Sequence, residues 1–290
     1  MGEKLNWKRK DHTAPILCRD GKVPYLYFPL LEQAEEVCHG FSTRLGGVSS
    51  GCYSTMNFRL NSSDSMDNVK ENFQRIADAI DFDINGLVLT HQTHTTNVRV
   101  VTEADAGKGI LRERDYTDID GLVTNVPGIT LGTFYADCVP LYFYDPVKHA
   151  IGLSHSGWRG TVQRMGACTI AKMQQEYGSN PADILACVGP SICGDCYEVG
   201  EEVAEAFREA FGQETGKKKG IVNPGVRQGK YQLNLWKANE QVLLDAGILP
   251  KHLAVTNICT RCNSELLFSH RVMGSERGNL GAFLGLKEGK

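Results

Sequence analysis

Short apolar runs separated by tight turns fill the middle of the chain, a pattern typical of β-strands. Extended runs are predicted at Gly121–Asn125, Thr130–Tyr135, Leu141–Tyr144 and Ile151–Ser154. Pro140 has no amide hydrogen to donate, so it indicates a strand edge or a bulge. Cys138 and His155 stand where apolar runs meet polar, glycine-containing turns. Residues 118–160 are therefore predicted to form neighbouring strands that carry two chemically reactive side chains at their ends.

Further extended runs lie on both sides of this segment. A hairpin is predicted at Ile16–Arg19 and Tyr25–Phe28, around the turn signal Asp20-Gly21-Lys22. The remaining predicted strands are Val37–Ser42, Leu87–Leu89, Val98–Val101, Ile184–Val188, Leu253–Ile258, Leu266–Ser269 and Leu280–Leu284. The stretch from Ala104 to Thr117 is charged and contains glycine, so it is expected to be a surface excursion.

Apolar residues at helical spacing predict helices in several separate segments. These are about Asp67–Ile80, Thr161–Tyr177, Glu201–Phe211 and Leu235–Ala246. Residues 1–15 are expected to be a flexible polar arm, and Lys217–Lys219 a solvated loop. Strands outnumber helices and do not alternate with them regularly, which favours a mixed α+β fold. Because neither a low-complexity linker nor an internal repeat is present, residues 1–290 are predicted to form one domain.

Composition places the chain among ordinary globular proteins, with 41% hydrophobic and 22% charged residues in 290. A net charge of −3 predicts no general affinity for nucleic acid or an anionic membrane. No apolar run approaches the ~20 residues of a membrane helix, and no apolar segment follows the charged N-terminus to form a signal peptide. A cytoplasmic location is the expectation. Oligomeric state cannot be read from the sequence, although a monomer is favoured.

Ten cysteines are a high number for such a chain. In a reducing compartment they are expected as thiols or metal ligands more often than as disulfides. Two pairs have CxxC spacing, Cys193 with Cys196 and Cys259 with Cys262. Two such pairs are a common source of a four-cysteine zinc site, but they stand far apart in the sequence. A structural metal, free thiols and a disulfide all remain open for them.

Cys138 and His155 suggest a different kind of metal site. Zinc binds thiolate and imidazole, and a catalytic zinc keeps three protein ligands and one open position. The third ligand is expected from the sequence HQTH, where His91 and His94 are both candidates. Residues three apart on an extended segment point to opposite faces, so only one of them should point inward. The structural alternative is a buried thiol and a hydrogen-bonded core histidine.

Several motifs resemble those of the YfiH-like, laccase-domain family, once described as multicopper polyphenol oxidases. They occur in order as HQTH, TDIDGLVT, TFYADCVPLYFYD, GLSHSGWRG and VGPSICGDCYEVGEEV, with FSTRLGGVS and LLFSHR nearer the termini. The resemblance spans about Val37–Leu286. It implies a mixed β-sandwich flanked by helices, related to cysteine hydrolases. It also implies that His94, Cys138 and His155 are the metal ligands. Cys193 and Asp195 depart from the family pattern, so the resemblance leaves the role of the CxxC pairs open.

The resemblance implies a zinc-dependent purine nucleoside phosphorylase, which splits adenosine, inosine or methylthioadenosine with phosphate and also has adenosine deaminase activity. An alternative is an amidohydrolase that edits peptidoglycan precursors at the same site. A non-enzymatic metal-binding module is disfavoured by the three-ligand count. Polyphenol oxidation is least expected, since multicopper oxidases need histidines in paired motifs. This chain has eight histidines, mostly single. Copper would compete with zinc at such ligands.

Candidate substrate contacts lie beside the metal ligands in the sequence. The segment His155–Gly160 leads into a predicted helix, whose N-terminus favours an anion such as phosphate. Arg159 is a candidate for a bidentate phosphate contact, and Arg44, in a glycine loop, is a second candidate. Both arginines could equally form ordinary surface or structural ion pairs. Asp137 is expected as a catalytic acid or base, as an anchor for Cys138 or as a turn cap. His39, His91 and His270 are expected to be structural.

Overall fold

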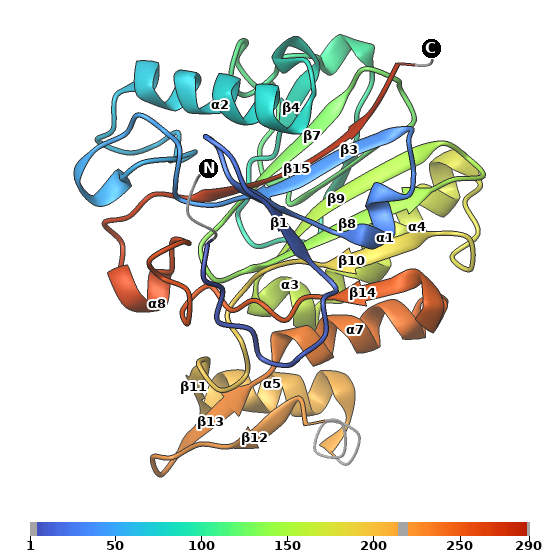
Figure 1. Ribbon diagram of the computed structural model, residues 1–290. Helices are drawn as coiled ribbons and strands as arrows, with labels where there is room; N and C mark the ends of the chain where they lie inside the picture. The colour runs from blue at the N-terminus through green and yellow to red at the C-terminus, as the bar shows by residue number, and fades with distance from the viewer. Residues whose placement is uncertain (1–4, 214–219, 289–290) are drawn as a thin grey trace.

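Two six-stranded β-sheets lie against each other in the protein (Figure 1), whose computed structural model describes residues 5–213 and 220–288. In spatial order the first sheet contains β1 (Leu17–Arg19), β2 (Tyr25–Tyr27), β3 (Val37–Ser42), β15 (Leu280–Leu286), β7 (Thr130–Tyr135) and β4 (Leu87–Leu89). The second contains β14 (Leu253–Val255), β10 (Leu185–Val188), β8 (Val139–Asp145), β9 (Ala150–Ser156), β6 (Gly121–Thr124) and β5 (Val98–Val100). A small third sheet holds β11 (Glu198–Gly200), β13 (Lys230–Leu233) and β12 (Val222–Pro224).

Alternation along the strands builds separate apolar layers. On β8, Tyr142 and Tyr144 join the core between the two large sheets, where they meet side chains from β7 and β15. The intervening Leu141 and Phe143 belong to a second core on the opposite face of the same sheet. Both faces of β8 are therefore buried, which explains why its sequence is an almost continuous apolar run.

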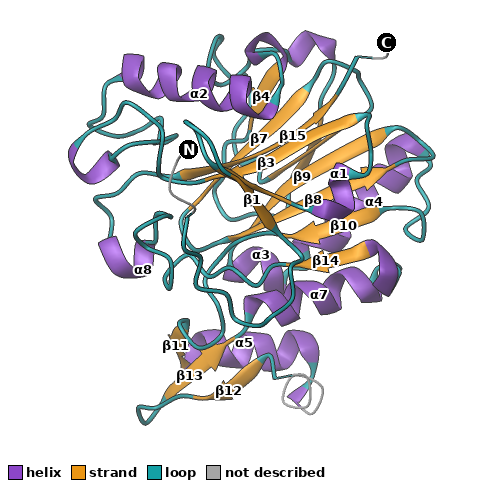
Figure 2. Cartoon of the chain, viewed as in Figure 1, coloured by secondary structure: helices purple, strands orange, loops and turns teal. Residues whose placement is uncertain are grey.

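Helices cover the outer faces of both large sheets (Figure 2). On the first sheet α2 (Met66–Ile80) packs Phe73 against Phe134 and Phe283. The second sheet carries α4 (Met165–Tyr177) and α7 (Leu235–Asp245), while α5 (Glu201–Phe211) packs on the small sheet. The short helices are α1 (Pro29–Glu32), α3 (Trp158–Val162) and α8 (His270–Met273). The predicted α+β fold, a β-sandwich flanked by helices, is confirmed.

The helix predicted over Thr161–Tyr177 is wrong in one respect, because the chain forms two helices there. Helix α3 ends at Val162 and α4 begins at Met165, with Arg164 between them in the left-handed region at φ 61°. The break lets each helix follow its own packing. Helix α4 brings Gly166 so close to Leu243 of α7 that an added Cβ would stand 2.8 Å from Leu243 Cδ2. Helix α3 also contacts α7. The break at Arg164 therefore lies between two helices that pack on the same neighbour.

The strand predicted over Leu266–Ser269 is also wrong. This segment is a turn, in which the amides of Leu266 and Leu267 both donate to the carbonyl of Asn263. Leu267 and Phe268 are fully buried in the core between the sheets. Their apolar character anchors a loop and does not indicate strand pairing. The strand predicted over Leu253–Ile258 is likewise shorter, since β14 ends at Val255.

Other sequence expectations have clear structural outcomes. The β1–β2 hairpin is confirmed, with Cys18 opposite Leu26. Pro140 is the second residue of β8, at the end of the strand where pairing with β10 stops. In the polar arm, the amide of Lys8 donates to Asn263 Oδ1 at 2.8 Å, which ties the arm to the body.

Lys217–Lys219 and residues 1–4 lie outside the described residues. None of the described helices is long and apolar enough to cross a membrane.

Candidate metal centre

His94, Cys138 and His155 come together from three different loops and strands. His155 is the penultimate residue of β9, and Cys138 immediately precedes β8. These strands are antiparallel, with Pro140 opposite His155, so their ends bring the thiol and the imidazole together. His94 enters from the loop between β4 and β5, and its ring centre is 4.9 Å from that of His155. One ligand atom from each residue lies within 4.8 Å of the other two.

A single buried carboxylate, that of Asp120, organises two of these ligands. Its Oδ2 lies 2.7 Å from His155 Nδ1, which leaves Nε2 of that ring for the site. The same carboxylate accepts the successive backbone amides of Thr93, His94 and Thr95 at 2.9, 3.2 and 3.0 Å. These bonds fix a turn in which His94 has φ 67°. A carboxylate behind a histidine is the usual support of a metal ligand, because it sets the tautomer and the ring orientation.

Gly157 makes room for the ligands. A Cβ at this position would stand 2.8 Å from His94 Cδ2 and 3.2 Å from Cys138 Sγ. The backbone at Gly157 has φ −74°, which any residue can adopt, so the constraint is space and not conformation. The glycine in the sequence His155-Ser156-Gly157-Trp158 is therefore explained by close packing against two of the candidate metal ligands.

Electrostatics favour the charged forms of Cys138, which is half-buried, and of His155, which is buried. Burial alone would raise the pKa of the Cys138 thiol, but the charge and hydrogen bonds of His155 and His94 outweigh it and lower the pKa to about 6. Burial would lower the pKa of His155, but Cys138 and Asp120 outweigh it and raise the pKa to about 9. A metal ion bound there would displace the Nε2 proton of His155. A thiolate next to two neutral imidazoles, one of them held by a carboxylate, is a donor set that fits zinc. Copper also binds such ligands.

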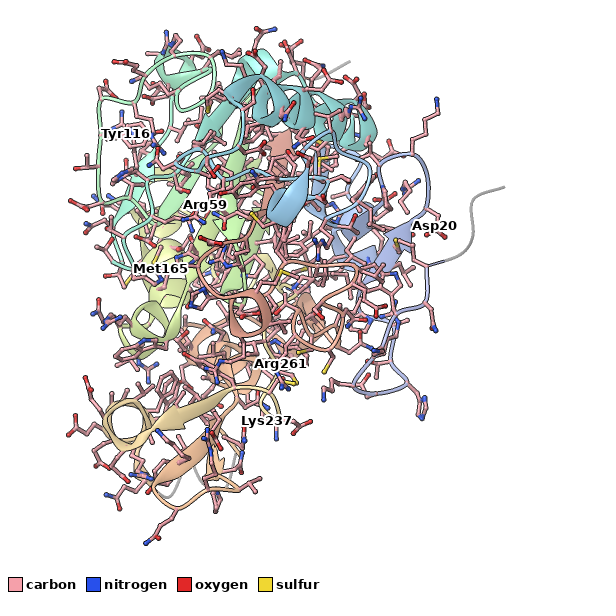
Figure 3. The ribbon with its side chains drawn as sticks, turned by 90° about the vertical axis from the view of Figure 1, so that its left-hand side faces the viewer. Asp20, Arg59, Tyr116, Met165, Lys237 and Arg261 are labelled. Atoms are coloured by element: carbon pink, nitrogen blue, oxygen red, sulfur yellow. The ribbon has the colours of Figure 1, made fainter. Side chains whose placement is uncertain are left out.

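The site opens into a pocket of about 330 Å³. Residues at the ends of β7 and β9 line it, together with residues of the neighbouring loops. Its lining includes Arg59, Arg114 and Arg277 besides the three ligand residues. Figure 3 labels Arg59 on the side of the molecule where Tyr116 and Met165 are also drawn. The volume is in the range of small-molecule sites.

The pocket arginines are held by neutral groups and not by carboxylates of the described residues. Arg59 Nη1 donates to the carbonyls of Ser275 and Arg277 at 2.6 and 3.2 Å. Arg277 Nη1 donates to the Gly278 carbonyl at 3.1 Å and to Asn279 Oδ1, while its buried Nε has no partner within the described part of the chain. Burial and the nearby Arg59 lower the pKa of Arg277. Two adjacent guanidinium groups with spare donors suit an oxyanion.

The arginines predicted from the sequence lie elsewhere. Arg44 is committed to backbone carbonyls, with Nε 2.9 Å from Ser54 O and Nη1 3.1 Å from Ser264 O, and it stacks on Phe268. The Arg159 guanidinium lies 4.3 Å from the centre of the Trp158 ring. Neither arginine lines the pocket. Their proposed substrate contacts stay a prediction without support from the pocket geometry.

Asp137 lies next to Cys138 but turns its carboxylate away from the pocket. Oδ1 accepts from the Thr260 hydroxyl at 2.6 Å, and Oδ2 accepts from the Arg271 amide at the start of α8 at 2.7 Å. Its backbone has φ 86°, so it also forms the turn that leads into Cys138. Of the roles expected from the sequence, these contacts favour an anchor over an acid or base, which stays a prediction.

The remaining candidate histidines have different surroundings. His39 is buried and accepts the Phe28 amide at Nε2, at 2.8 Å, and burial lowers its pKa to about 4. His91 lines the pocket, where its Nδ1 accepts the Asp118 amide at 3.3 Å. His270 is exposed at the first turn of α8. None of the three belongs to a metal-binding group among the residues that the structure describes.

With this geometry established, comparison with known proteins identifies the family. Residues 38–287 match the family described as multi-copper polyphenol oxidoreductase laccase. The chain belongs to this family. The laccase-family name implies several coppers, yet in the described chain only one group of potential metal ligands contains histidine, namely His94 with Cys138 and His155. A three-ligand site of this kind holds one ion and does not provide the paired histidines of a multicopper centre.

Relatives with other names share most of this laccase-family chain. "Purine nucleoside phosphorylase YlmD" of Bacillus subtilis (strain 168) is 36% identical over 264 residues, covering 88% of this chain and 90% of that protein. "Adenosine deaminase RL5" from an unknown prokaryotic organism is 34% identical, covering 84% and 92%. The crystal structure of Bacillus licheniformis hypothetical protein YfiH, 35% identical, covers 93% of this chain and 99% of that chain with a TM-score of 0.85. The first two of these relatives are named as enzymes that act on purine nucleosides.

Several residues of the site were missed by sequence reasoning. Asp120 and Gly157 lie inside motifs that the sequence comparison used, TDIDGLVT and HSGWRG, but their contacts join residues far apart in the chain. Arg59 and Arg277 stand in polar loop segments with no distinguishing pattern. An aspartate directly before an apolar strand was the one available signal for Asp120.

Proposed function

We propose that this protein is a zinc-dependent purine nucleoside phosphorylase that also deaminates adenosine. Adenosine, inosine and methylthioadenosine are the proposed nucleosides, and the products of phosphorolysis are the free base and ribose 1-phosphate. The observation that carries the proposal is that the pocket containing His94, Cys138 and His155 also contains Arg59 and Arg277. A metal-binding donor set and an oxyanion site in one pocket match the needs of a reaction between a nucleoside and phosphate.

Phosphorolysis needs a phosphate held next to the ribose C1′ carbon. A phosphate oxygen forms the new bond to C1′ while the glycosidic bond breaks, and the purine leaves with the electron pair and takes up a proton. In this proposal Arg59 and Arg277 bind and orient the phosphate through charge-assisted hydrogen bonds. The backbone carbonyls that hold Arg59 keep its guanidinium in place before substrate binds. Such preorganised charge is the main way enzymes stabilise phosphate-containing transition states.

The residues present fit a zinc ion without a further protein ligand. Cys138 supplies a thiolate, and His94 and His155 supply imidazole nitrogens, with Asp120 fixing the tautomer of His155. A zinc bound there supplies Lewis-acid activation of a substrate or water in its open position. The chain's own part is to hold the ligands still, which Asp120 does for the loop of His94 and Asp137 does for the turn of Cys138.

Deamination would use the same pocket. Water adds to C6 of adenosine, and ammonia leaves, so that inosine is formed without any need for phosphate. The relative named adenosine deaminase supports this second activity. We also propose a cytoplasmic location, where both nucleosides and phosphate are available. All ten cysteines are free thiols in the structure, as expected in a reducing compartment.

A specific observation supports one alternative, a cysteine hydrolase that edits peptidoglycan precursors. The pair formed by Cys138, with its lowered pKa, and His155 resembles an activated thiol nucleophile and its base. A thiolate cannot be a zinc ligand and a nucleophile at the same moment, so metal dependence separates the phosphorylase from a hydrolase that uses Cys138 as its nucleophile. We favour the phosphorylase because the pocket arginines have no evident use in the attack of a thiol on an amide.

The test is turnover of adenosine and inosine by the purified protein with and without phosphate. We expect free base and ribose 1-phosphate only when phosphate is present, loss of activity after zinc is chelated, and recovery when zinc is added. Cys138→Ala and His94→Ala should abolish turnover. Full phosphorolysis by metal-free protein would refute the proposal. Release of an amino acid from a muramyl precursor by metal-free protein would instead support the cysteine hydrolase.

A further inference from the structure

Two CxxC segments that are distant in the sequence meet beside the second sheet. The first, with Cys193 and Cys196, follows β10, and the second, with Cys259 and Cys262, follows β14. Strands β10 and β14 are parallel neighbours, so their carboxyl ends lie side by side and the chain leaves both strands at the same end of the sheet. A bridge between Ser191 and Cys259 continues the pairing into the loops. The topology therefore places the two CxxC segments against each other.

The four sulfur atoms form a compact cluster. All of them lie within 4.8 Å of one another, and Cys196 Sγ is 3.5 Å from Cys262 Sγ. Four thiolates around a tetrahedral zinc, each at about 2.3 Å, stand about 3.8 Å apart. A disulfide requires two sulfurs at about 2.05 Å, and the four cysteines are free. The spacing matches the vacant shell of a tetrahedral thiolate site more closely than it matches a bonded pair.

Donors and positive charges surround the sulfurs as they do in zinc knuckles. The amides of Cys193 and Cys262 point at Cys259 Sγ, at 3.3 and 3.5 Å. The Arg261 guanidinium lies 3.3 Å from Cys196 Sγ, and Figure 3 shows sulfur atoms beside the labelled Arg261. Lys10 reaches the same loop, where it pairs with Asp195 at 2.9 Å. Four thiolates and one zinc carry a net charge of about −2. Arg261 and Lys10 offset part of it, since Lys10 is also paired with Asp195.

We propose that Cys193, Cys196, Cys259 and Cys262 bind a second zinc ion with a structural role. Four protein ligands close the coordination shell and leave no open position for a substrate, which distinguishes this site from the three-ligand centre. Cys193, Cys196 and Cys259 are buried. The cluster lies in turns outside the named helices and strands, so a metal crosslink would add to the backbone hydrogen bond from Thr260 to Ser191 that joins the two loops.

The proposed zinc would support the catalytic pocket through Asp137. Thr260, between the second pair of cysteines, donates to Asp137 Oδ1, and the Ile192 amide donates to the Asp137 carbonyl at 3.0 Å. Both CxxC loops are therefore hydrogen-bonded to the residue that precedes Cys138. The polar arm is attached to the same loops through Lys8 and Asn263. One ion would thus fix the arm, two loops and the turn that presents a catalytic-site ligand.

Zinc content per chain is the direct test. We expect two zinc ions in the protein purified with zinc, one in Cys193→Ser or Cys262→Ser, and one in Cys138→Ala, in which only the four-cysteine site remains. Cys168→Ser, a change on α4 outside both groups, should keep two. A single zinc per chain that is lost in Cys138→Ala, or a protein mass lower by two hydrogens because of a disulfide, would overturn the proposal.

Cobalt substitution keeps the test independent of whether a serine variant folds. In full-length Cys138→Ala protein, bound cobalt should be tetrahedral and show the intense thiolate-to-metal absorption of four sulfurs. Loss of cobalt binding in this protein, or a spectrum of nitrogen and oxygen ligands, would contradict a four-cysteine site. A Cys138→Ala/Cys262→Ser double variant is expected to bind no tightly held metal. If it still holds one ion per chain, the four cysteines are not the ligands.

Discussion

Asp120 Oδ2 lies 2.7 Å from His155 Nδ1, and the same carboxylate holds the backbone turn that carries His94. Two of the three proposed metal ligands are thus positioned by one buried side chain. The third, Cys138, is positioned separately by Asp137 and by the packing of Gly157. The proposed metal centre is consequently assembled from parts that can be disturbed one at a time, which makes several of its features testable.

Asp120→Asn should weaken zinc binding about 10- to 100-fold without removing a ligand. The amide keeps the size of the side chain but loses the charge that stabilises the His155 ring and the amides of Thr93 and Thr95. Zinc affinity measured by competition with a chelator is the readout, followed by activity at saturating zinc. The matched control is Asp118→Asn, an exposed neighbour outside the site. Equal zinc affinity in both variants would show that Asp120 does not support the ligands.

Gly157→Ala should also impair the metal site, for a steric reason. The added methyl group would press on His94 and Cys138, and overpacking of this kind costs about 1–3 kcal/mol. We expect zinc affinity and turnover to fall about tenfold or more, measured by chelator competition and by initial rates.

Gly160→Ala is the control for this change, because both glycines lie at the start of α3. A Cβ at Gly160 meets its nearest neighbour, the His155 carbonyl oxygen, at 3.6 Å, which is ordinary contact. Alanine is also a better helix former than glycine, by about 1 kcal/mol. This variant should keep its zinc affinity. If both variants behave alike, the space at Gly157 is not what the ligands require.

The two sets of arginines give a direct comparison between sequence and structure. Arg277→Gln should raise KM for phosphate about 10- to 100-fold and leave KM for the nucleoside nearly unchanged, since a hydrogen bond to a charged group contributes about 1.5–3 kcal/mol. Arg59→Gln is expected to act in the same direction. Initial rates over a matrix of phosphate and nucleoside concentrations provide both constants.

Arg159→Gln is the informative control, because the sequence alone made Arg159 a candidate for a phosphate contact. Its guanidinium stacks on Trp158 outside the pocket, so KM for phosphate should stay within about twofold of the unaltered protein, a difference under about 0.5 kcal/mol. An increase in this variant, with none in Arg277→Gln, would restore the sequence-based assignment and reject the pocket-based one.

Local sequence patterns predicted much of the fold for a physical reason. Apolar runs bounded by turn residues predict strands such as β8 and β9. Cys138 and His155 were candidate site residues because they stand where those runs end. Asp120 was not predictable in this way, because its hydrogen bonds reach residues 35 and 26 positions away. Arg59 and Arg277 likewise become neighbours only through the tertiary fold. Nearness in sequence to a glycine loop was a poor guide to which arginines reach the pocket.

The misassigned segments have the same cause. Leu266–Ser269 has strand-like composition, but Leu267 and Phe268 are buried in a turn whose first two amides donate to the Asn263 carbonyl. The break at Arg164 depends on how α3 and α4 pack on α7, and helical periodicity runs through it without interruption. Tertiary contacts overrode a local preference in both places.

A final prediction concerns pH and a buried carboxylate outside the catalytic pocket. Asp105 is 3% exposed, pairs with Lys108 and Arg99 at 2.8 and 2.9 Å, and accepts the Thr102 amide at 3.0 Å. Burial would raise the pKa of Asp105, but the bonds from Lys108, Thr102 and Arg99 outweigh it and lower the pKa well below its ordinary value. The folded state therefore binds the proton more weakly than the unfolded chain. The Asp105 carboxylate therefore stabilises the fold fully when the pH is above its pKa in the unfolded chain, about 4. This stabilisation is lost as the pH falls below that value.

Asp105→Asn should accordingly reduce the free energy of unfolding by about 2 kcal/mol or more at pH 7. The difference from the unaltered protein should shrink as the pH is lowered from about 5 toward 3, because the wild-type carboxylate then loses its advantage. Urea unfolding at a series of pH values measures this gap. Asp115→Asn, on the exposed side of the same lysine, should have a much smaller effect. A gap for Asp105→Asn that stays constant with pH would mean that its stabilisation does not depend on charge, and the capping of the turn at Thr102 would then be the dominant contribution.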